Sequence, residues 1–442
     1  MAKVFLSFFN DMYDADVPEK MPCFYEAFIK GLQKSGNDVL YYMMTKFVSD
    51  DFGRAPQLVL KKIKNFHPDI IILFNNCFYD ISNDFSCPII VYSVDSPLYF
   101  SNKNVLSIKK NNFIYASSDA SNECYIRKKF CTGKNDFCLI PFFSEVYAEN
   151  IEQTTNISFL GSSFWSSSSI SPWNVFQRTE HTEQEYEDFK RIAEKIAANP
   201  FDESLSAFLP ENLPLSSWIM PLSAECRSRV LSEVADLGLK IYGPKSWAQD
   251  FGSDMNLTLA YRQQTLYSVK HNQDLYNASK ICLNINHVQA VNSFSWRVCD
   301  IMASNGCLVS QEKSVLQERF PNCRIPTFSN KYEAREICKK LLENEAMRQD
   351  IVAACQEEIN AKYRFKHVLK ILEQATGVCL LQQSNGDTIC LPTIQTKKRK
   401  GGKSSLFWHS LLFSLSFLPL FSKCFKRDRL FKKIKKRMED AC

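Results

Sequence analysis

Apolar residues along much of the chain fall into short continuous runs, and the segments between them have helical periodicity. In the first part of the chain these runs occupy residues 3–9, 39–42, 69–74, 88–94, 113–116 and 137–140. Segments 24–34 and 58–65 place apolar side chains at the spacing of a buried helix face. Continuous apolar strands that alternate with helices are typical of a parallel sheet covered on both faces. Residues 1–150 are therefore predicted to form one Rossmann-like α/β domain.

A second alternating region begins with an apolar strand at 156–162, which ends in a Gly-Ser turn. A polar insertion follows at about 163–222, with one helix predicted near 183–198. Further helices and strands are then predicted at 226–237, 240–243, 280–283, 327–328, 331–343, 345–360 and 363–375. Residues 151–375 are thus expected to form a second Rossmann-like domain that faces the first across a cleft.

The stretch 284–311 carries the clearest site pattern. A polar loop, 286–293, follows an apolar strand, and apolar residues then recur at i, i+4, i+7 and i+8 from Phe294, as on a buried helix face. Asn305-Gly306 is expected to end this helix before a short strand at 307–309. In open α/β folds, ligands bind where the carboxyl ends of strands meet the amino ends of helices. We therefore expect the site at this loop and the start of this helix.

Arg297 and Asp300 lie three residues apart on one face of that helix, and they could form an ion pair with each other. Alternatively, Arg297 binds a diphosphate, and Asp300 accepts hydrogen bonds from sugar or ribose hydroxyls. A density of polar side chains just upstream favours the second interpretation, because it suits a polyhydroxylated ligand. These side chains belong to Asn284, Asn286, His287, Asn292 and Ser293. His287 taken alone is equally compatible with a structural histidine.

Three cations and one acid complete the set of candidates. Arg227 and Arg229 open the helix before the strand at 240–242, Lys245 follows that strand, and all three are also compatible with a solvated surface. Asp95 follows the buried strand at 88–94, where it is a candidate on the other side of the cleft or an Asx turn before Pro97.

Composition and charge exclude several classes of protein. The 17 cysteines of the 442-residue chain are scattered through apolar strands, so we expect reduced core thiols and a cytoplasmic protein. No Cys or His spacing indicates a metal site. Residues 397–442 hold fourteen Lys and Arg against three acids, whereas the net charge of the whole chain is +6, which leaves −5 for the rest. A body that binds nucleic acid is therefore not expected.

The C-terminal region separates from the two domains by composition. Residues 376–403 are predicted to be a linker, and 404–442 a basic and apolar tail. The apolar run at 406–422 is at the lower limit for a membrane span, and cations flank it. An in-plane anchor on an anionic membrane surface, through residues 397–437, is the favoured interpretation. A true span, a solvated basic tail and a partner-binding helix are the alternatives.

Over about 1–375, the chain resembles the two-domain GT-B glycosyltransferases of the bacterial spore-maturation (CgeB-like) type, which are related to glycosyltransferase group 1. The resemblance is carried by 156–162, 240–243 with Trp247, 279–284, 291–300 and 303–306, with support from 25–28 and 91–97 in the first domain. It implies a nucleotide-diphosphate-sugar donor on the second domain, an acceptor on the first, and no metal or other cofactor.

The resemblance also assigns individual residues. Arg297 matches the family's arginine, and Arg229 and Gly161 fall where related enzymes contact the diphosphate. Asp300 and Asn292 stand where related enzymes carry the two glutamates of an E-x7-E pattern. Asp300 is then expected to hold the donor ribose.

The predicted function is transfer of a sugar to an envelope glycan or lipid-linked acceptor at the inner face of the cytoplasmic membrane. Arg297, Arg229 and Lys245 would stabilise the departing diphosphate, and His287, Asn292 and Ser293 would contact the sugar. Asp95 would act on the acceptor side. The alternatives are a sugar-nucleotide epimerase on the same fold and a non-catalytic, membrane-associated glycan-binding scaffold.

Overall fold

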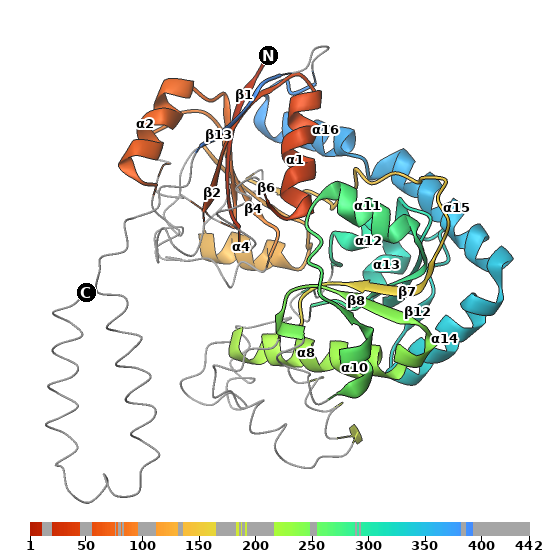
Figure 1. Cartoon of the computed structure of the whole chain (residues 1–442). Helices are drawn as coiled ribbons and strands as arrows, with labels where there is room; N and C mark the ends of the chain where they lie inside the picture. Colours follow the sequence, from red (N-terminus) through yellow and green to blue (C-terminus); the bar gives the residue numbers. More distant parts are fainter. Residues whose placement is uncertain are drawn as a thin grey trace, which may run out of the picture. The chain divides into compact units, whose positions relative to one another are not determined.

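The structure is a computed structural model, and it places two parallel sheets in one compact unit that ends at Pro392 (Figure 1). It describes residues 1–10, 20–44, 55–75, 77, 81, 84–95, 112–130, 136–164, 183–184, 187, 191, 216–247, 254–287, 290, 293–381 and 386–391. The predicted tail, 404–442, and most of the predicted insertion, 163–222, lie outside these residues.

Within the described residues, the first sheet has seven strands, all of them parallel, in the order β13-β2-β1-β3-β4-β5-β6. The strands are β1 Lys3–Phe9, β2 Asp38–Met44, β3 Ile70–Phe74, β4 Ile89–Ser93, β5 Phe113–Ser117, β6 Phe137–Leu139 and β13 Thr388–Leu391. The central strands β3 and β4 are buried at every position. Their unbroken apolar runs reflect this burial, because both faces of the sheet are covered.

Four helices accompany this sheet: α1 Cys23–Lys34, α2 Gln57–Phe66, α4 Asn122–Phe130 and α16 Phe365–Thr376. Helix α16 comes from the far end of the chain and lies beside α1 (Figure 1). Phe365 of α16 packs edge-on against Phe28 of α1, with ring centroids 5.0 Å apart. The first domain is thus built from residues 1–150 together with a C-terminal return of the chain.

The second sheet has six parallel strands among the described residues, in the order β12-β11-β10-β7-β8-β9. These are β7 Thr155–Leu160, β8 Leu239–Tyr242, β9 Tyr261–Arg262, β10 Ser279–Asn284, β11 Cys307–Gln311 and β12 Thr327–Phe328. Its helices are α8 Ser216–Glu233, η3 Ala235–Leu237, α10 Met255–Ala260, α11 Val269–Asn277, α12 Arg297–Met302, α13 Ser314–Arg319, α14 Lys331–Glu343 and α15 Glu345–Lys362. The alternation of strand and helix confirms the predicted pair of Rossmann-like sheets.

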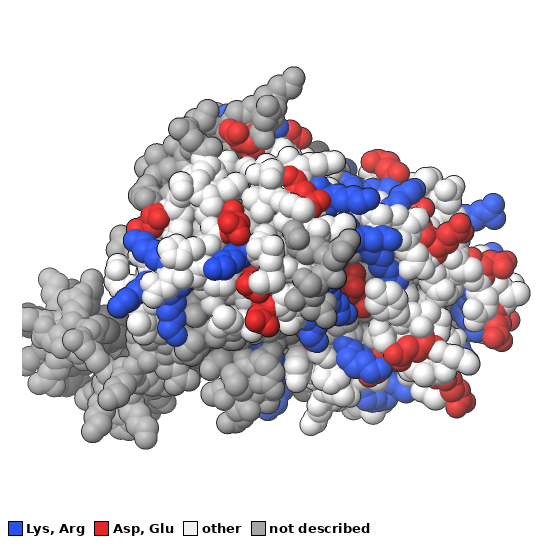
Figure 2. All heavy atoms as spheres, turned by 90° about the horizontal axis from the view of Figure 1, so that it is seen from above, with Lys and Arg blue, Asp and Glu red and all other residues white. Residues whose placement is uncertain are grey.

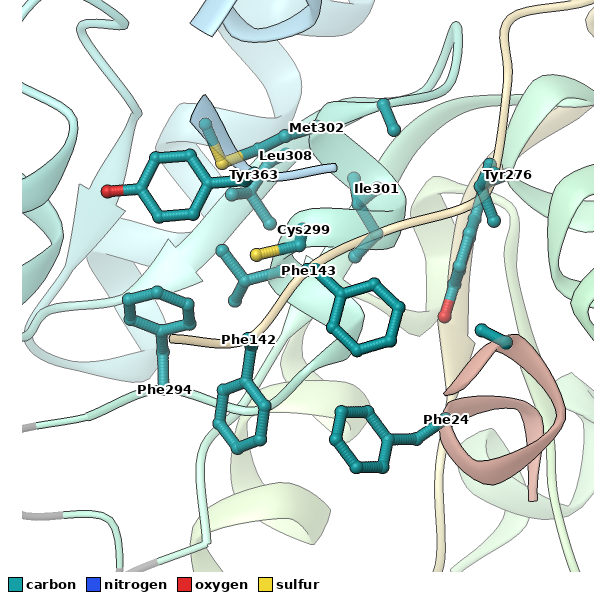
Figure 3. Packing of buried hydrophobic residues seen from close by; sticks show 14 of the residues in the cluster. Phe24, Phe142, Phe143, Tyr276, Phe294, Cys299, Ile301, Met302, Leu308 and Tyr363 are labelled. Carbon is teal, nitrogen blue, oxygen red and sulfur yellow. The ribbon is translucent and has the colours of Figure 1, made fainter. Parts of the chain in front are cut away.

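Apolar side chains from both domains meet around α12, and Figure 3 shows this packing at close range. Phe24 of α1 stacks on Trp296, just before α12, with centroids 5.4 Å apart and planes 18° from parallel. Phe142, in the segment that leads to the second sheet, contacts Phe294 at 6.2 Å. Helix α12 is therefore fixed by the first domain as well as by its own sheet.

The chain crosses between the sheets twice, and the two crossings are tied together. Arg364, between α15 and α16, is buried and donates to the carbonyl oxygens of Ser144 (3.0 Å) and Val146 (2.5 Å). The backbone N–H of Ser144 donates in return to the carbonyl of Tyr363 at 2.9 Å. These bonds give partners to the backbone carbonyls of Ser144, Val146 and Tyr363.

Three predicted boundaries were wrong. The predicted linker, 376–403, contains strand β13, whose Ile389 pairs with Leu40 of β2. Helix α8 begins at Ser216, ten residues before the predicted start and inside the predicted insertion. Helix α12 begins at Arg297 rather than Phe294, because the residues before it form a turn that packs against the first domain.

Candidate active site

The carboxyl ends of β7, β8 and β10 meet at a tight junction of backbone. The N–H of Gly161, after β7, donates to the carbonyl of Tyr242 at 3.0 Å, and Trp247 Nε1 donates to the Gly161 carbonyl at 2.8 Å. A Cβ placed on Gly243, after β8, would collide with that carbonyl oxygen and approach Trp247 Nε1 to 2.8 Å. Glycine is required at position 243 because the two strand ends approach so closely.

Arg297 lies directly over this junction. A Cβ on Gly161 would lie 3.1 Å from Arg297 Nη2, so the guanidinium covers the glycine. Arg297 Nη1 donates to Ser295 Oγ at 3.2 Å, and Ser295 Oγ donates to Asn284 Oδ1 at 3.0 Å. This chain of hydrogen bonds anchors Arg297, the residue predicted to bind the diphosphate, to the end of β10.

Arg227, on α8, is a second arginine at the same place; the sequence offered it as a candidate cation, but the diphosphate contact was assigned to its neighbour Arg229. It is only 2% exposed, and its guanidinium donates to the carbonyls of Ser162 (2.5 Å) and Ile285 (3.1 Å), after β7 and β10. The face of its guanidinium lies 4.1 Å from the centre of the Phe164 ring. Its Nε is buried without a hydrogen-bond partner.

The two arginines concentrate positive charge at the strand ends. Burial, and next the charge of Arg297, hold the pKa of Arg227 well below its ordinary value. Among the described residues, neither guanidinium forms an ion pair with a carboxylate; the hydrogen bonds of both go to carbonyl and hydroxyl oxygens. Buried charge without a counter-charge is costly, so this arrangement favours an anionic ligand with several oxygen acceptors.

His287 lies beside Arg227 and is half-buried. Its Nδ1 is 3.1 Å from Ser223 Oγ, and its ring packs 4.2 Å from that of Phe164. Burial, and then the charge of Arg227, lower the pKa of His287 to about 3. The imidazole is therefore neutral near pH 7, where it can accept or donate a hydrogen bond but adds no positive charge.

Arg229 does not join this group, which corrects its predicted role. Its Nε pairs with Glu225 at 2.6 Å, and its Nη1 pairs with Glu183 at 2.9 Å. Residues two positions apart lie on different faces of a helix, so the Arg229 side chain points away from the face that carries Arg227. The charge predicted for Arg229 is supplied by Arg227 instead.

Two other predicted contacts, Asn284 and Ser293, have internal partners. The Asn284 amide is buried and donates to Ser310 Oγ at 2.9 Å while accepting from Ser295, so it supports the Arg297 loop instead of facing a ligand. Ser293 Oγ donates to the carbonyl of Ser118 in the first domain at 3.3 Å. Lys245 is exposed on the turn after β8. Asn292 lies outside the described residues.

Asp300 lies in the contact between the domains. Its Oδ1 accepts a hydrogen bond from Ser144 Oγ at 2.7 Å, and its Oδ2 lies 3.9 Å from the Cys23 thiol of α1. The residue is 7% exposed, and burial raises the pKa of its carboxyl to about 6. A contact with ribose, as predicted, would require Asp300 to exchange these partners.

Asp95 follows β4 in the first sheet and is exposed. The Asn75 side chain binds both the backbone and the carboxylate of Asp95.

In the part of the chain that the structure describes, no group of three or more His, Cys, Asp or Glu side chains is placed to hold a metal ion. No helix there is long and apolar enough to cross a membrane.

Solved structures with the same arrangement of domains decide the fold. HepE from Anabaena in complex with UDP-glucose is 10% identical, with a TM-score of 0.51, covering 86% of this chain and 100% of HepE. Sucrose-phosphate synthase from Thermosynechococcus elongatus is 11% identical, with a TM-score of 0.50, covering 85% of this chain and 97% of the synthase. This chain has the GT-B fold.

Two further comparisons bear on the GT-B assignment. A mutant of S. aureus TarM in complex with Fondaparinux, alpha-GlcNAc-glycerol and UDP is 9% identical, with a TM-score of 0.50, covering 86% of this chain and 100% of TarM. Residues 227–374 match the family model described as "Glycosyl transferase-like". No match to a curated protein was found. The GT-B fold and this domain agree with the predicted glycosyltransferase class.

The sequence could have favoured Arg227 over Arg229. Residues 224 and 231 of α8, with Val234 just after the helix, form the buried apolar stripe, and Arg227 falls on it, three residues after Ala224 and four before Leu231. A cation on the buried stripe of a helix that faces strand ends is an unusual placement. Arg229 lies off the stripe, which is why it reaches solvent and its acidic partners.

Proposed function

We propose that this protein is a glycosyltransferase that moves a sugar from a nucleotide-diphosphate-sugar donor to a glycan or lipid-linked acceptor. The observation that carries the proposal is the convergence of Arg227 and Arg297 on the carboxyl ends of β7 and β10. A diphosphate offers the negative counter-charge that these guanidiniums lack among the described residues. Charge-assisted hydrogen bonds of this kind are the strong ones in proteins.

The same pair of arginines accounts for a metal-independent reaction. As the sugar departs from the donor, negative charge develops on the diphosphate, and preorganised cations stabilise it in the transition state. Neutral His287 beside Arg227 provides a hydrogen-bonding group for the sugar or the diphosphate. Arg227 and Arg297 are thus assigned to the leaving group, and Asp95, in the first domain, to the acceptor.

The finer assignments belong to the proposal as well. The resemblance to the spore-maturation subgroup favours an envelope glycan as acceptor. Residues 397–437 would hold the protein on an anionic membrane surface, because clusters of Lys and Arg beside an apolar segment attract acidic lipids. On the face shown in Figure 2, cationic and anionic side chains are interspersed, and the described part of that face offers no extended basic surface for nucleic acid.

Calorimetry with UDP-, GDP- and CMP-sugars tests the donor assignment. UDP-glucose is the first probe, because HepE, which has the same fold, was solved with it. We expect saturable binding of at least one of these donors, competed by the corresponding free nucleotide. Absence of binding for the whole panel at millimolar concentration would remove the proposal.

A further inference from the structure

Asn75 and Asp95 lie at the carboxyl edge of the first sheet, directly after β3 and β4. Asn75 has a left-handed backbone, with φ of 49°, which asparagine adopts more readily than most residues. Its N–H donates to the carbonyl of Tyr92 in β4 at 2.9 Å. The turn after β3 is therefore tied to the neighbouring strand.

The Asn75 side chain binds the Asp95 turn through both ends of its amide. Oδ1 accepts from the backbone N–H groups of Val94 and Asp95, each at 3.1 Å. Nδ2 donates to Asp95 Oδ2 at 2.7 Å, and Ser93 Oγ donates to the Asp95 carbonyl. Two backbone donors thus orient the amide, and the amide orients the carboxylate, which is the preorganisation that a reacting group needs.

Asp95 lies at the edge of the first sheet that contacts the loop leading to Arg297. Strand β4 pairs with β5, with Ser93 opposite Ser117, so the turn at Asp95 neighbours the turn at Ser118. The Ser118 carbonyl accepts from Ser293, in the loop that leads to Arg297. Asp95 is exposed there, one strand away from the contact between the two domains.

We propose that Asn75 is a positioning residue that orients the ionised Asp95 carboxylate toward the acceptor hydroxyl. The inference rests on the proposed function. In transfer, the acceptor oxygen forms the new bond to the anomeric carbon, and the Asp95 carboxylate takes the hydroxyl proton. The bond from that carbon to the diphosphate breaks, and its electron pair leaves with the diphosphate.

Asn75→Asp is the informative variant, because it keeps an oxygen for the two backbone donors but replaces the Nδ2 donor by a second carboxylate. A like charge at this distance disfavours ionisation of Asp95. With UDP-glucose as donor and p-nitrophenyl glycosides or water as acceptor, we expect the acidic limb of the kcat/KM profile to move upward by about one pH unit or more. Among the described residues at this edge, Asp119 is a further carboxylate; it is buried and accepts from the N–H of Ser121 at 2.8 Å.

Two further variants separate positioning from structure. Asn75→Gly keeps the left-handed backbone and removes the clamp, so kcat should fall about tenfold or more while UDP-glucose affinity is retained. Asn122→Asp is the matched control at the same edge. Its side chain donates to Ser117 Oγ at 3.0 Å and does not touch Asp95, so the acidic limb should stay in place.

The outcomes are distinct. The proposal is supported if the acidic limb of the kcat/KM profile moves to higher pH in Asn75→Asp and stays at its wild-type position in Asn122→Asp. An unshifted limb in Asn75→Asp overturns it, as does full transfer by Asp95→Asn or an equal loss of UDP-glucose affinity in Asn75→Gly. Calorimetry of the wild-type protein reads the donor site alone, so failure of the proposed function is recognised separately.

Discussion

The hydroxyl of Ser144 donates a 2.7 Å hydrogen bond to Oδ1 of Asp300, at the point where the chain passes from the first sheet to the second. Asp300 belongs to the same short helix as Arg297, whose guanidinium covers the strand junction. The segment that contains Ser144 is held in turn by Arg364 at the second crossing. Helix α12 therefore links the arginine site to the junction between the domains.

Asp300 gives a prediction for the dependence of stability on pH. Burial raises the pKa of its carboxyl from 3.8 to about 6, so the folded protein binds a proton more tightly than the unfolded chain does. The free energy of unfolding should therefore fall as the pH rises through this window, by roughly 2 to 3 kcal/mol in total. Asp300→Asn should flatten the dependence and be the more stable protein at pH 8. Urea denaturation between pH 4 and 8 measures both effects.

Asp350, exposed on α15, provides the matched control for that measurement. The free energy of unfolding of Asp350→Asn should depend on pH as it does in the wild type, because the replaced carboxylate is exposed to solvent. If Asp300→Asn is instead less stable than the wild type at pH 8, the carboxylate contributes more through its hydrogen bonds than its burial costs.

Arg227 and Arg229 of α8, together with Arg297 of α12, provide a test of the donor site. Arg297→Ala and Arg227→Lys should each weaken UDP-glucose binding by about 10- to 100-fold, because a charge-assisted hydrogen bond contributes about 1.5 to 3 kcal/mol. Arg229→Ala should bind like the wild type, since its guanidinium pairs with Glu225 and Glu183. Titration calorimetry compares the three variants, and thermal melts check that each is folded. A loss confined to Arg229→Ala would restore the prediction made from the sequence.

Gly161 and Gly243 should respond differently to a methyl group. In Gly243→Ala, the new Cβ collides with the Gly161 carbonyl oxygen, and we expect a loss of about 2 kcal/mol or more in the free energy of unfolding. In Gly161→Ala, the nearest atoms are Arg297 Nη2 and a ring atom of Phe159, each at 3.1 Å. A side chain can move where a backbone cannot, so this variant should lose more donor affinity than stability. Equal losses of stability would contradict this distinction.

Two truncations separate the predicted tail from the sheet. A chain that ends at Thr396 keeps β13 and should retain wild-type stability, while its binding to vesicles that contain phosphatidylserine is lost. A chain that ends at Leu381 removes β13 and uncovers the edge of β2, which is a template for aggregation. Vesicle co-sedimentation measures the loss of membrane binding, and light scattering measures the aggregation. Undiminished vesicle binding by the Thr396 truncation would rule out the anchor.

The strands were the most predictable part of this protein. Runs such as Ile70–Phe74 are apolar at every position, because the sheet is covered on both faces. Helix α11 was missed, since its buried side chains include Asn272 and Asn277, whose polarity hides the periodicity. Strand β13 was missed because its only strand partner is β2, more than 300 residues away, and a four-residue run carries little signal by itself.

The neighbourhood of some candidate site residues was predictable, but their hydrogen-bond partners were not. Gly161 and Arg297, both assigned to the diphosphate from the sequence, lie beside each other, because the carboxyl ends of parallel strands share one edge. The partners of Asp300 and Asn284 come from segments distant in the chain, so residue type alone could not show that both are engaged internally. Local periodicity, by contrast, would have distinguished Arg227 from Arg229.

The return of the chain through α16 and β13 has a consequence for synthesis on the ribosome. The sheet that begins at Lys3 receives its last strand only when Leu391 has emerged, whereas the second sheet has all its described strands once Phe328 is made. The domain that starts first is therefore completed last. Until then, β2 has an open edge and the face of α1 that meets α16 is uncovered, so an arrested nascent chain would expose the first domain while the second sheet already has its described strands.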